Sequence, residues 1–303
     1  DGAAVADPGA RFIDPTALAR IGNLELIART VVDGFVAGLH RSPYLGLSLD
    51  FAEYRAYMPG DDVRRVDWRL YARTDRYYVK EYEAETNADF VAVLDVSRSM
   101  GYGSGGITKL DYARYLAATL ACFSHRQRDR VGLIAFDDEV VERVPASARN
   151  YEVVLDAIGR LEAGRRGSLA GPLRRAAESL GRRGIVIVVS DFYEEPESAV
   201  AAVRQLRARG GDVIVFHVLD PAEIELPFDR AATFRDLESG EAIPVIPTAL
   251  RAQYRALVEA HTASLARLFA AEGIDYTLVS TASPLDHVLF GYLAARQKLM
   301  RVR

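Results

Sequence analysis

The stretch Phe90–Ser99, FVAVLDVSRS, decides the fold that we predict for this chain. Its first five residues form an apolar run of strand length, and Asp95 ends that run. Similar runs alternate with helical patterns further along the chain, at Val131–Phe136, Ile185–Ser190, Val213–Leu219 and Tyr276–Val279. This alternation is typical of a parallel sheet covered on both faces. We therefore predict a doubly wound, mostly parallel α/β sheet, with Glu139–Val144 as an antiparallel edge strand after the Asp137-Asp138 turn.

Two other regions complete the predicted architecture. Residues 11–88 begin with an amphipathic helical pattern that runs from Asp14 to about Val36, and two alternating stretches follow it, which indicates an N-terminal α+β module. Residues 89–303 then form the sheet domain. Within that domain, residues 221–273 are too long for an ordinary crossover and carry a hairpin signal before a long helical pattern. We interpret residues 221–273 as a hairpin-plus-helix insertion.

Composition excludes several classes of protein. Half of the 303 residues are hydrophobic, about a quarter are charged, and the net charge is −4, so we expect a folded protein that does not bind nucleic acid. No apolar run reaches 18 residues, which predicts no membrane span in this chain and a cytoplasmic location. The single cysteine, Cys122, excludes an internal disulfide and a cysteine-based zinc site.

Oxygen-bearing side chains gather at the predicted strand ends. Asp95, Ser97 and Ser99 follow the first sheet strand, Ser168 follows Gly167 just before a helix, and Asp191 follows the third strand. Open α/β sheets bind ligands at the carboxyl ends of their strands, and hard divalent cations require oxygen ligands. The alternative is that these residues only cap helices. Because all five are expected at one edge of the sheet, we favour a metal site.

This set resembles the metal-ion-dependent adhesion site of von Willebrand factor A domains. The resemblance implies that Ser97, Ser99 and Ser168 bind Mg²⁺, or Mn²⁺ or Ca²⁺, directly or through water. It implies that the carboxylates of Asp95 and Asp191 mostly do not bind the metal directly but lie next to the residues that do. Ser168 departs from the pattern, which has threonine there, so it keeps the hydroxyl but lacks the methyl group that stiffens the side chain.

Motifs elsewhere in the chain resemble the DUF58 family, a domain of unknown function. They cover most of the chain: Tyr57–Arg64, Val66–Trp68, Tyr71–Thr74, Tyr78–Glu83, Phe234–Glu238 and Tyr292–Arg296. The resemblance implies a partnership with a MoxR-type AAA+ ATPase, in which members act as adaptors in protein maturation or complex assembly. The resemblance does not identify a chemical reaction that these proteins catalyse.

Partner capture follows from the predicted chemistry. Neutral hydroxyl ligands leave most of a divalent charge uncompensated, so the carboxylate of a protein partner is a natural further ligand. Arg98, Arg165 and Arg166 flank the predicted site and would favour the same acidic group through charge-assisted hydrogen bonds. We therefore expect a non-enzymatic, divalent-metal-dependent protein-binding adaptor.

The sequence supports an enzymatic function less well than a binding function. Gly101–Gly106 contains a formal Gly-x-Gly-x-x-Gly, but it starts too far beyond the strand for dinucleotide binding, and the Thr108-Lys109 order is the reverse of a phosphate-binding loop. His125 and His217 are expected to be structural. A metal-dependent hydrolase acting on a phosphate or ester remains the alternative function, because Asp95 ends a strand as phosphoryl-transfer aspartates do.

Overall fold

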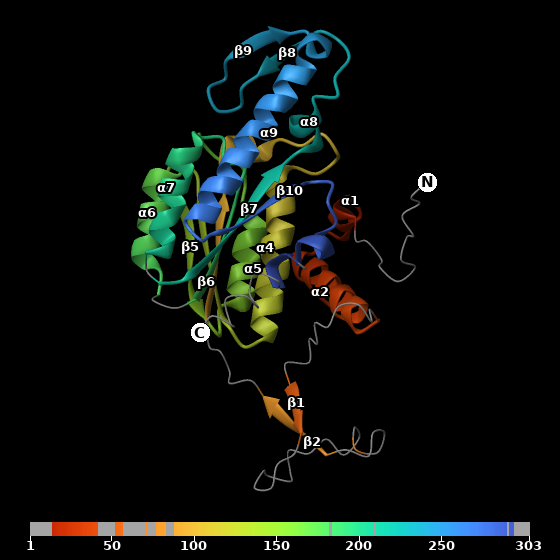
Figure 1. Ribbon diagram of the computed structural model, residues 1–303, viewed down its shortest axis with the longest axis vertical. Helices are drawn as coiled ribbons and strands as arrows, with labels where there is room; N and C mark the ends of the chain where they lie inside the picture. Colours follow the sequence, from red (N-terminus) through yellow and green to blue (C-terminus); the bar gives the residue numbers. More distant parts are fainter. Residues whose placement is uncertain are drawn as a thin grey trace.

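The computed structural model describes residues 14–41, 52–56, 71, 77–82, 88–181, 184–208, 210–289 and 291–293. Its centre is a six-stranded sheet with the strand order β10-β7-β6-β3-β4-β5 (Figure 1). The strands are β3 (Asp89–Asp95), β4 (Arg130–Phe136), β5 (Val140–Ser147), β6 (Gly184–Ser190), β7 (Asp212–Leu219) and β10 (Asp275–Ser280). All neighbours pair in parallel except β5, which is the antiparallel edge strand. The predicted doubly wound, mostly parallel sheet is confirmed.

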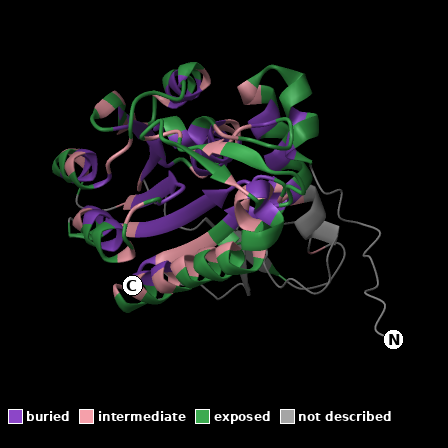
Figure 2. Ribbon diagram, turned by 90° about the horizontal axis from the view of Figure 1, so that it is seen from above, coloured by how far each residue is buried: buried purple, intermediate pink, exposed green. Residues whose placement is uncertain are grey.

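Helices cover both faces of the sheet. Successive residues of β3 point to opposite sides, so Phe90, Ala92 and Leu94 belong to one apolar cluster and Val91 and Val93 to another. The first cluster also contains residues of α2 (Leu24–Arg41), α4 (Lys109–Arg126) and α5 (Tyr151–Arg160). The second contains residues of α6 (Ala170–Ser179), α7 (Pro196–Arg207) and α9 (Pro247–Ala271). Figure 2 shows the buried strands enclosed between these two layers.

The N-terminal helix is interrupted, contrary to the single helix predicted from Asp14 to Val36. The chain forms α1 (Pro15–Leu18) and a 3-10 turn, η1 (Ala19–Ile21), before α2 starts. Gly22 has a φ of 66°, in the left-handed region that glycine adopts readily, and it ends the first turn. The side chain of Asn23 then accepts a hydrogen bond from the Leu26 amide at 2.9 Å, which caps the new helix.

The rest of the predicted N-terminal module is described in part. Strand β1 (Ala52–Ala56) pairs antiparallel with β2 (Tyr78–Tyr82) in a separate sheet. Most of the family motifs predicted between residues 57 and 83 lie outside the described residues. Helix α2 packs on α4 within the same apolar cluster as one face of the main sheet.

The insertion between β7 and β10 has the predicted form. It consists of α8 (Pro221–Glu225), the antiparallel pair β8 (Ala232–Arg235) and β9 (Ala242–Val245), and the long helix α9. In Figure 1 the hairpin stands beyond the carboxyl ends of the parallel strands, and α9 returns the chain along the sheet domain. Among the described residues, no helix has the length and apolar character needed to span a bilayer.

We predict that Phe269→Ala lowers the free energy of unfolding by about 3–5 kcal/mol. Phe269 is fully buried on α9, with its ring centroid 5.8 Å from that of Phe192 and 5.6 Å from that of Tyr276. Leu257→Ala on the same helix is the control, because Leu257 is 63% exposed and should change stability by less than about 0.5 kcal/mol. Equilibrium urea unfolding of both variants measures the difference. Equal losses would contradict the described packing of α9.

Candidate functional site

Two buried aspartates mark the carboxyl ends of adjacent strands. Asp95 ends β3 and Asp191 follows β6, and the two residues are 4% and 2% exposed. Asp95 accepts hydrogen bonds from the Ser97 amide at 2.8 Å and from the Ser190 hydroxyl at 2.6 Å. Burial and the nearby charge of Asp191 nevertheless raise the pKa of Asp95 to about 7. The structure therefore brings the two predicted carboxylates into electrostatic contact.

The predicted serines lie beside these carboxylates. The hydroxyl oxygens of Ser97 and Ser99 are 3.1 Å apart, and both side chains are buried. Gly167 packs directly against Ser97, because a Cβ built on Gly167 would lie 2.6 Å from the Ser97 Cβ atom. Ser168 follows in the same loop, is half-buried, and donates its amide to the Asp137 carbonyl at 3.2 Å. Only glycine at position 167 lets the two loops approach this closely.

Backbone hydrogen bonds hold these two loops together. The Arg98 amide donates to the Arg165 carbonyl at 2.9 Å, and the Gly164 amide donates to the Val96 carbonyl at 2.7 Å. The loop of residues 164–168 is thus fixed across the end of β3. This arrangement explains how residues 67 and 68 positions apart in the chain come to share one edge of the sheet.

Lys109 is a charged member of the site that the sequence analysis did not assign. Its side chain is 0% exposed, and its ammonium group lies 2.7 Å from a carboxylate oxygen of Asp191 and 2.7 Å from one of Glu223 on α8. Burial alone would lower the pKa of Lys109, but the two carboxylates outweigh it and raise the pKa, so the group stays charged. The sequence signals for Lys109 are its place at the start of α4, behind a threonine that caps the helix, and the rarity of lysine in this chain.

The predicted arginines differ in their surroundings. Arg98 is exposed. The guanidinium of Arg165 lies 3.5 Å from Asp137, 3.4 Å from Asp138 and 3.7 Å from Glu139, so it forms ion pairs with acids of its own chain while its side chain stays 59% exposed. Arg166 is exposed, lines the groove described below and interacts electrostatically with Asp236.

A carboxylate from the insertion reaches the same loops. One oxygen of Glu238 accepts a hydrogen bond from the Ser99 amide at 2.7 Å, and its other oxygen accepts one from the Gly167 amide at 2.9 Å. We call these two amide groups the amide pair. Glu238 belongs to the turn between β8 and β9 and is 139 residues away from Ser99 in the chain. Sequence reasoning identified the turn and the family motif that ends at Glu238, but not this contact.

The donor set fits a hard divalent cation. Ser97 and Ser99 present adjacent hydroxyl oxygens, and a cation beside them would oppose the burial and the neighbouring Asp191 charge that raise the pKa of Asp95. Lys109 already neutralises part of that charge on the Asp191 side. Among the described residues there is no group of three or more His, Cys, Asp or Glu side chains suited to a metal ion, so any site here depends on serine hydroxyls.

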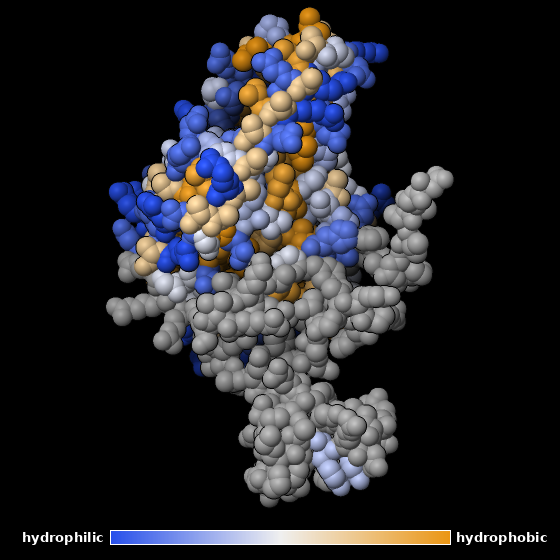
Figure 3. Space-filling model, in the orientation of Figure 1, coloured by the Kyte–Doolittle hydropathy of each residue, from blue (hydrophilic) through white to orange (hydrophobic). Residues whose placement is uncertain are grey.

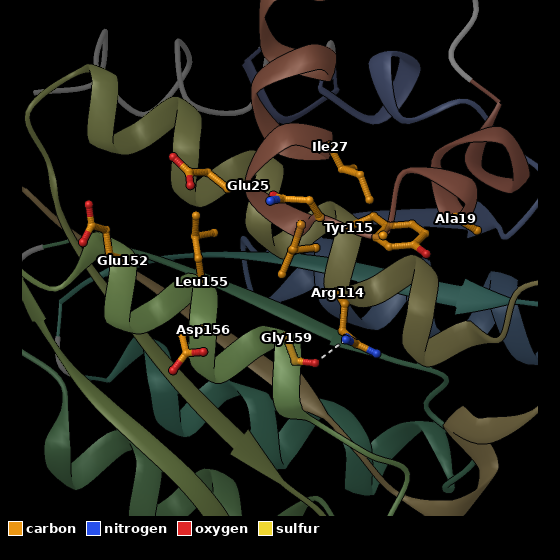
Figure 4. A pocket seen from close by; sticks show the side chains of 12 residues that line it. Ala19, Glu25, Ile27, Arg114, Tyr115, Glu152, Leu155, Asp156 and Gly159 are labelled. Carbon is orange, nitrogen blue, oxygen red and sulfur yellow. Dashed lines mark hydrogen bonds between the residues drawn. The ribbon is translucent and has the colours of Figure 1, made fainter.

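Two surface hollows bear on the location of a binding site. A groove of about 1000 Å³ opens over the strand ends, and Ser99, Ser168, Glu238, Tyr193 and Phe234 are among its lining residues. A second hollow of about 670 Å³ lies between α2, α4 and α5 (Figure 4). There Arg114 is held by the Ile158 carbonyl at 3.1 Å and by the Gly159 carbonyl. Of these two hollows, only the groove over the strand ends is lined by predicted site residues, namely Ser99, Arg166 and Ser168.

Similar proteins identify the family to which this chain belongs. A family model described as "Protein of unknown function DUF58" matches residues 53–264. This chain is a member of the DUF58 family. The uncharacterized protein Rv1480 of Mycobacterium tuberculosis is 32% identical over 293 residues, which is 94% of this chain and 91% of that protein. The uncharacterized protein Mb1516 of Mycobacterium bovis matches equally well.

Solved structures show what the fold is similar to. The hypothetical protein BatB from Bacteroides thetaiotaomicron has a TM-score of 0.50 and 18% identity, covering 69% of this chain and 99% of that chain. This likeness concerns the fold alone. The von Willebrand factor A domain of SpRpn10 has a TM-score of 0.40 and 10% identity, covering 67% of this chain and 93% of that chain.

We predict opposite stability effects for the two buried aspartates when EDTA is present at pH 8. The folded-state pKa of Asp95 is about 7, above its ordinary value of 3.8, so the folded protein keeps a proton that the unfolded chain releases. The free energy of unfolding therefore falls as the pH rises from 3.8 to about 7, and it stays low at higher pH. Asp95→Asn removes the unfavourable charge and should raise the free energy of unfolding by about 1 kcal/mol or more.

Asp191→Asn is the matched comparison at the neighbouring strand end. It weakens the charge-assisted bond to buried Lys109 and should lower the free energy of unfolding by about 1–3 kcal/mol. Chemical denaturation at pH 8 and at pH 5 measures both effects, and the gain from Asp95→Asn should shrink at the lower pH. The same sign for both variants at pH 8 would contradict the described electrostatics.

Proposed function

We propose that this DUF58 protein is a non-enzymatic adaptor that binds an acidic side chain of a protein partner at the strand ends, with the help of a divalent cation. The observation that carries the proposal is that the site already receives a carboxylate. Glu238 reaches the amide pair directly beside the Ser97 and Ser99 hydroxyls. The loops therefore have the shape and the donors that recognition of an acidic side chain requires.

The predicted site residues would have separate roles in binding the cation. Ser97 and Ser99 would hold the cation, with Ser168 at the neighbouring position and Asp95 and Asp191 supplying charge from behind. The cation, Mg²⁺ or alternatively Mn²⁺ or Ca²⁺, would attract the partner's carboxylate. Lys109 keeps Asp191 in place, and Gly167 keeps the second loop close to Ser97.

The surface around the groove suits a protein partner. Ile243 and Ile246 of the insertion and Leu250 of α9 are 54%, 60% and 44% exposed. Figure 3 shows apolar residues along the hairpin and α9, interspersed with hydrophilic ones. Large exposed apolar side chains beside polar groups are common at protein interaction sites.

The histidine near the site supports a binding role over catalysis. His217 is fully buried, burial lowers its pKa to about 3, and its Nδ1 atom lies 2.7 Å from the Tyr276 hydroxyl. A group in this state does not exchange a proton with a substrate near neutral pH. We therefore assign it a structural role.

The family resemblance suggests the partner. We propose that the acidic side chain belongs to a MoxR-type AAA+ ATPase or to a client that both proteins handle, during protein maturation or complex assembly in the cytoplasm. The ATPase would supply the energy for the assembly step, and the DUF58 protein would supply recognition.

The expected result is that a purified MoxR-type AAA+ ATPase from the same organism binds this protein at least about tenfold more tightly in Mg²⁺ than in EDTA. The double substitution of Ser97 and Ser99 by alanine should abolish that difference. Ser179→Ala is the matched control, because its hydroxyl donates only to the Ala176 carbonyl at the end of α6. Biolayer interferometry with immobilised protein measures the affinities.

The same preparations decide between binding and hydrolysis. We expect no turnover of nitrophenyl phosphate or nitrophenyl acetate in Mg²⁺, and metal-dependent turnover lost on Asp95→Asn would favour the hydrolase instead. Equal affinity for the ATPase in Mg²⁺ and EDTA would contradict metal dependence, and no affinity in either would contradict the partnership.

A further inference from the structure

We propose that the amides of Ser99 and Gly167 form a carboxylate-binding site in their own right, and that Glu238 is a tethered occupant which an acidic side chain of a partner must displace. The inference deepens the proposed function and rests on it only in the identity of the competing ligand. It makes the β8–β9 hairpin a built-in competitor for the same site.

The contact has the geometry of a recognition site. Each oxygen of the Glu238 carboxylate receives its own backbone N–H, at 2.7 Å and 2.9 Å, from two different loops. Hydrogen bonds to a charged acceptor are about twice as strong as neutral ones, and two parallel bonds also fix the orientation of the carboxylate. Both donors are backbone groups that no substitution except proline removes, so the amide pair is a property of the folded loops.

The hairpin turn is built to present Glu238. Asp236 accepts a hydrogen bond from the Glu238 amide at 2.8 Å and another from the Ser239 hydroxyl at 2.6 Å. Gly240 has a φ of 77°, which closes the turn in a conformation that other residues rarely adopt. The Ser239 hydroxyl also accepts from the Glu241 amide at 3.2 Å. A turn that is rigid before binding loses little conformational entropy when it binds.

The rest of the hairpin is weakly held. Between Pro227 and Ile246 no residue is buried, and most are exposed. One ring contact, between Phe228 and Phe234, has centroids 5.4 Å apart, and both residues belong to the insertion itself. Two-stranded hairpins are marginally stable alone, and segments with few buried contacts open at low free-energy cost. Glu238 is therefore a main anchor of the hairpin, and losing that anchor frees both the hairpin and the amide pair.

The competition follows from this tether. A side chain on the same chain acts at a high effective concentration, commonly in the millimolar range for short flexible links. An external carboxylate must overcome that advantage, so the apparent affinity of a partner is lower than the intrinsic affinity of the open site. The hairpin thus raises the threshold for partner binding and rejects isolated acidic groups.

The test uses Glu238→Ala and Glu238→Gln in the full chain, with Glu241→Ala as the matched control. Glu241 lies three residues further along the same hairpin and is exposed. The probe is a cyclised peptide of residues 232–245 that carries Glu at position 238, and a second peptide carries Gln there. Fluorescence anisotropy in Mg²⁺ and in EDTA reports binding.

We expect the Glu peptide to bind Glu238→Ala at least about tenfold more tightly than it binds wild type or Glu241→Ala. Glu238→Gln should fall between them, because an amide has one acceptor oxygen for two donors. The Gln peptide should bind Glu238→Ala more weakly than the Glu peptide does. Equal binding of the Glu peptide to all four proteins would overturn the proposal.

Amide hydrogen exchange gives an independent measurement on the same variants. Exchange at Ser99 and Gly167 should accelerate in Glu238→Ala and stay at the wild-type rate in Glu241→Ala, and adding the Glu peptide should slow it again. Unchanged exchange in Glu238→Ala would overturn the assignment of Glu238 as occupant. Thermal melting checks that each variant remains folded.

The outcomes separate this inference from the proposed function. Peptide binding to Glu238→Ala together with no affinity for the AAA+ ATPase would support the amide pair and contradict the adaptor role. Metal-dependent ATPase binding that is equally tight in wild type and Glu238→Ala would support the adaptor and overturn the competition.

Discussion

Two like charges buried side by side are the constraint on which the rest of the site depends. Asp95 and Asp191 end neighbouring parallel strands and are almost completely buried, so their mutual repulsion adds to the cost of removing each from water. Two features reduce that cost. Hydroxyl and amide donors of Ser190 and Ser97 satisfy Asp95, while the buried ammonium of Lys109 pairs with Asp191. The cost that remains at Asp95 appears as its raised pKa of about 7, which burial and the neighbouring charge of Asp191 cause.

Periodicity in the sequence predicted the sheet well, and the reason is physical. Strands buried on both faces read as continuous apolar runs, and in a parallel sheet their carboxyl ends must lie at one edge. The positions of Asp95 and Asp191 therefore followed from the runs that precede them. Helix α4 also follows local sequence signals, because a capping threonine precedes it and its apolar residues keep helical spacing.

Contacts that depend on tertiary structure could not be predicted in this way. Gly22 breaks the N-terminal helix although the apolar spacing continues through it, because a left-handed glycine and an asparagine cap outweigh the pattern. The Lys109 pair and the Glu238 contact join residues that are 82 and 139 positions apart. Local sequence signals place these residues at a helix start and in a turn but do not identify their contacts, and Arg165 likewise forms ion pairs with acids of its own chain that the sequence did not reveal.

The insertion reaches the site at two points that differ in how firmly they are held. Glu223 on α8 contacts buried Lys109, and α8 itself is fixed by Asp220, whose buried carboxylate accepts bonds from the Ala222 amide and the Ser104 amide. Glu238 lies at the far end of the exposed hairpin and touches only the amide pair among the site groups. Opening the hairpin therefore need not disturb the Lys109–Glu223 contact or the strand ends behind it. One insertion can thus stabilise the charged interior of the site and control access to its surface, because the two contacts lie on elements of unequal stability.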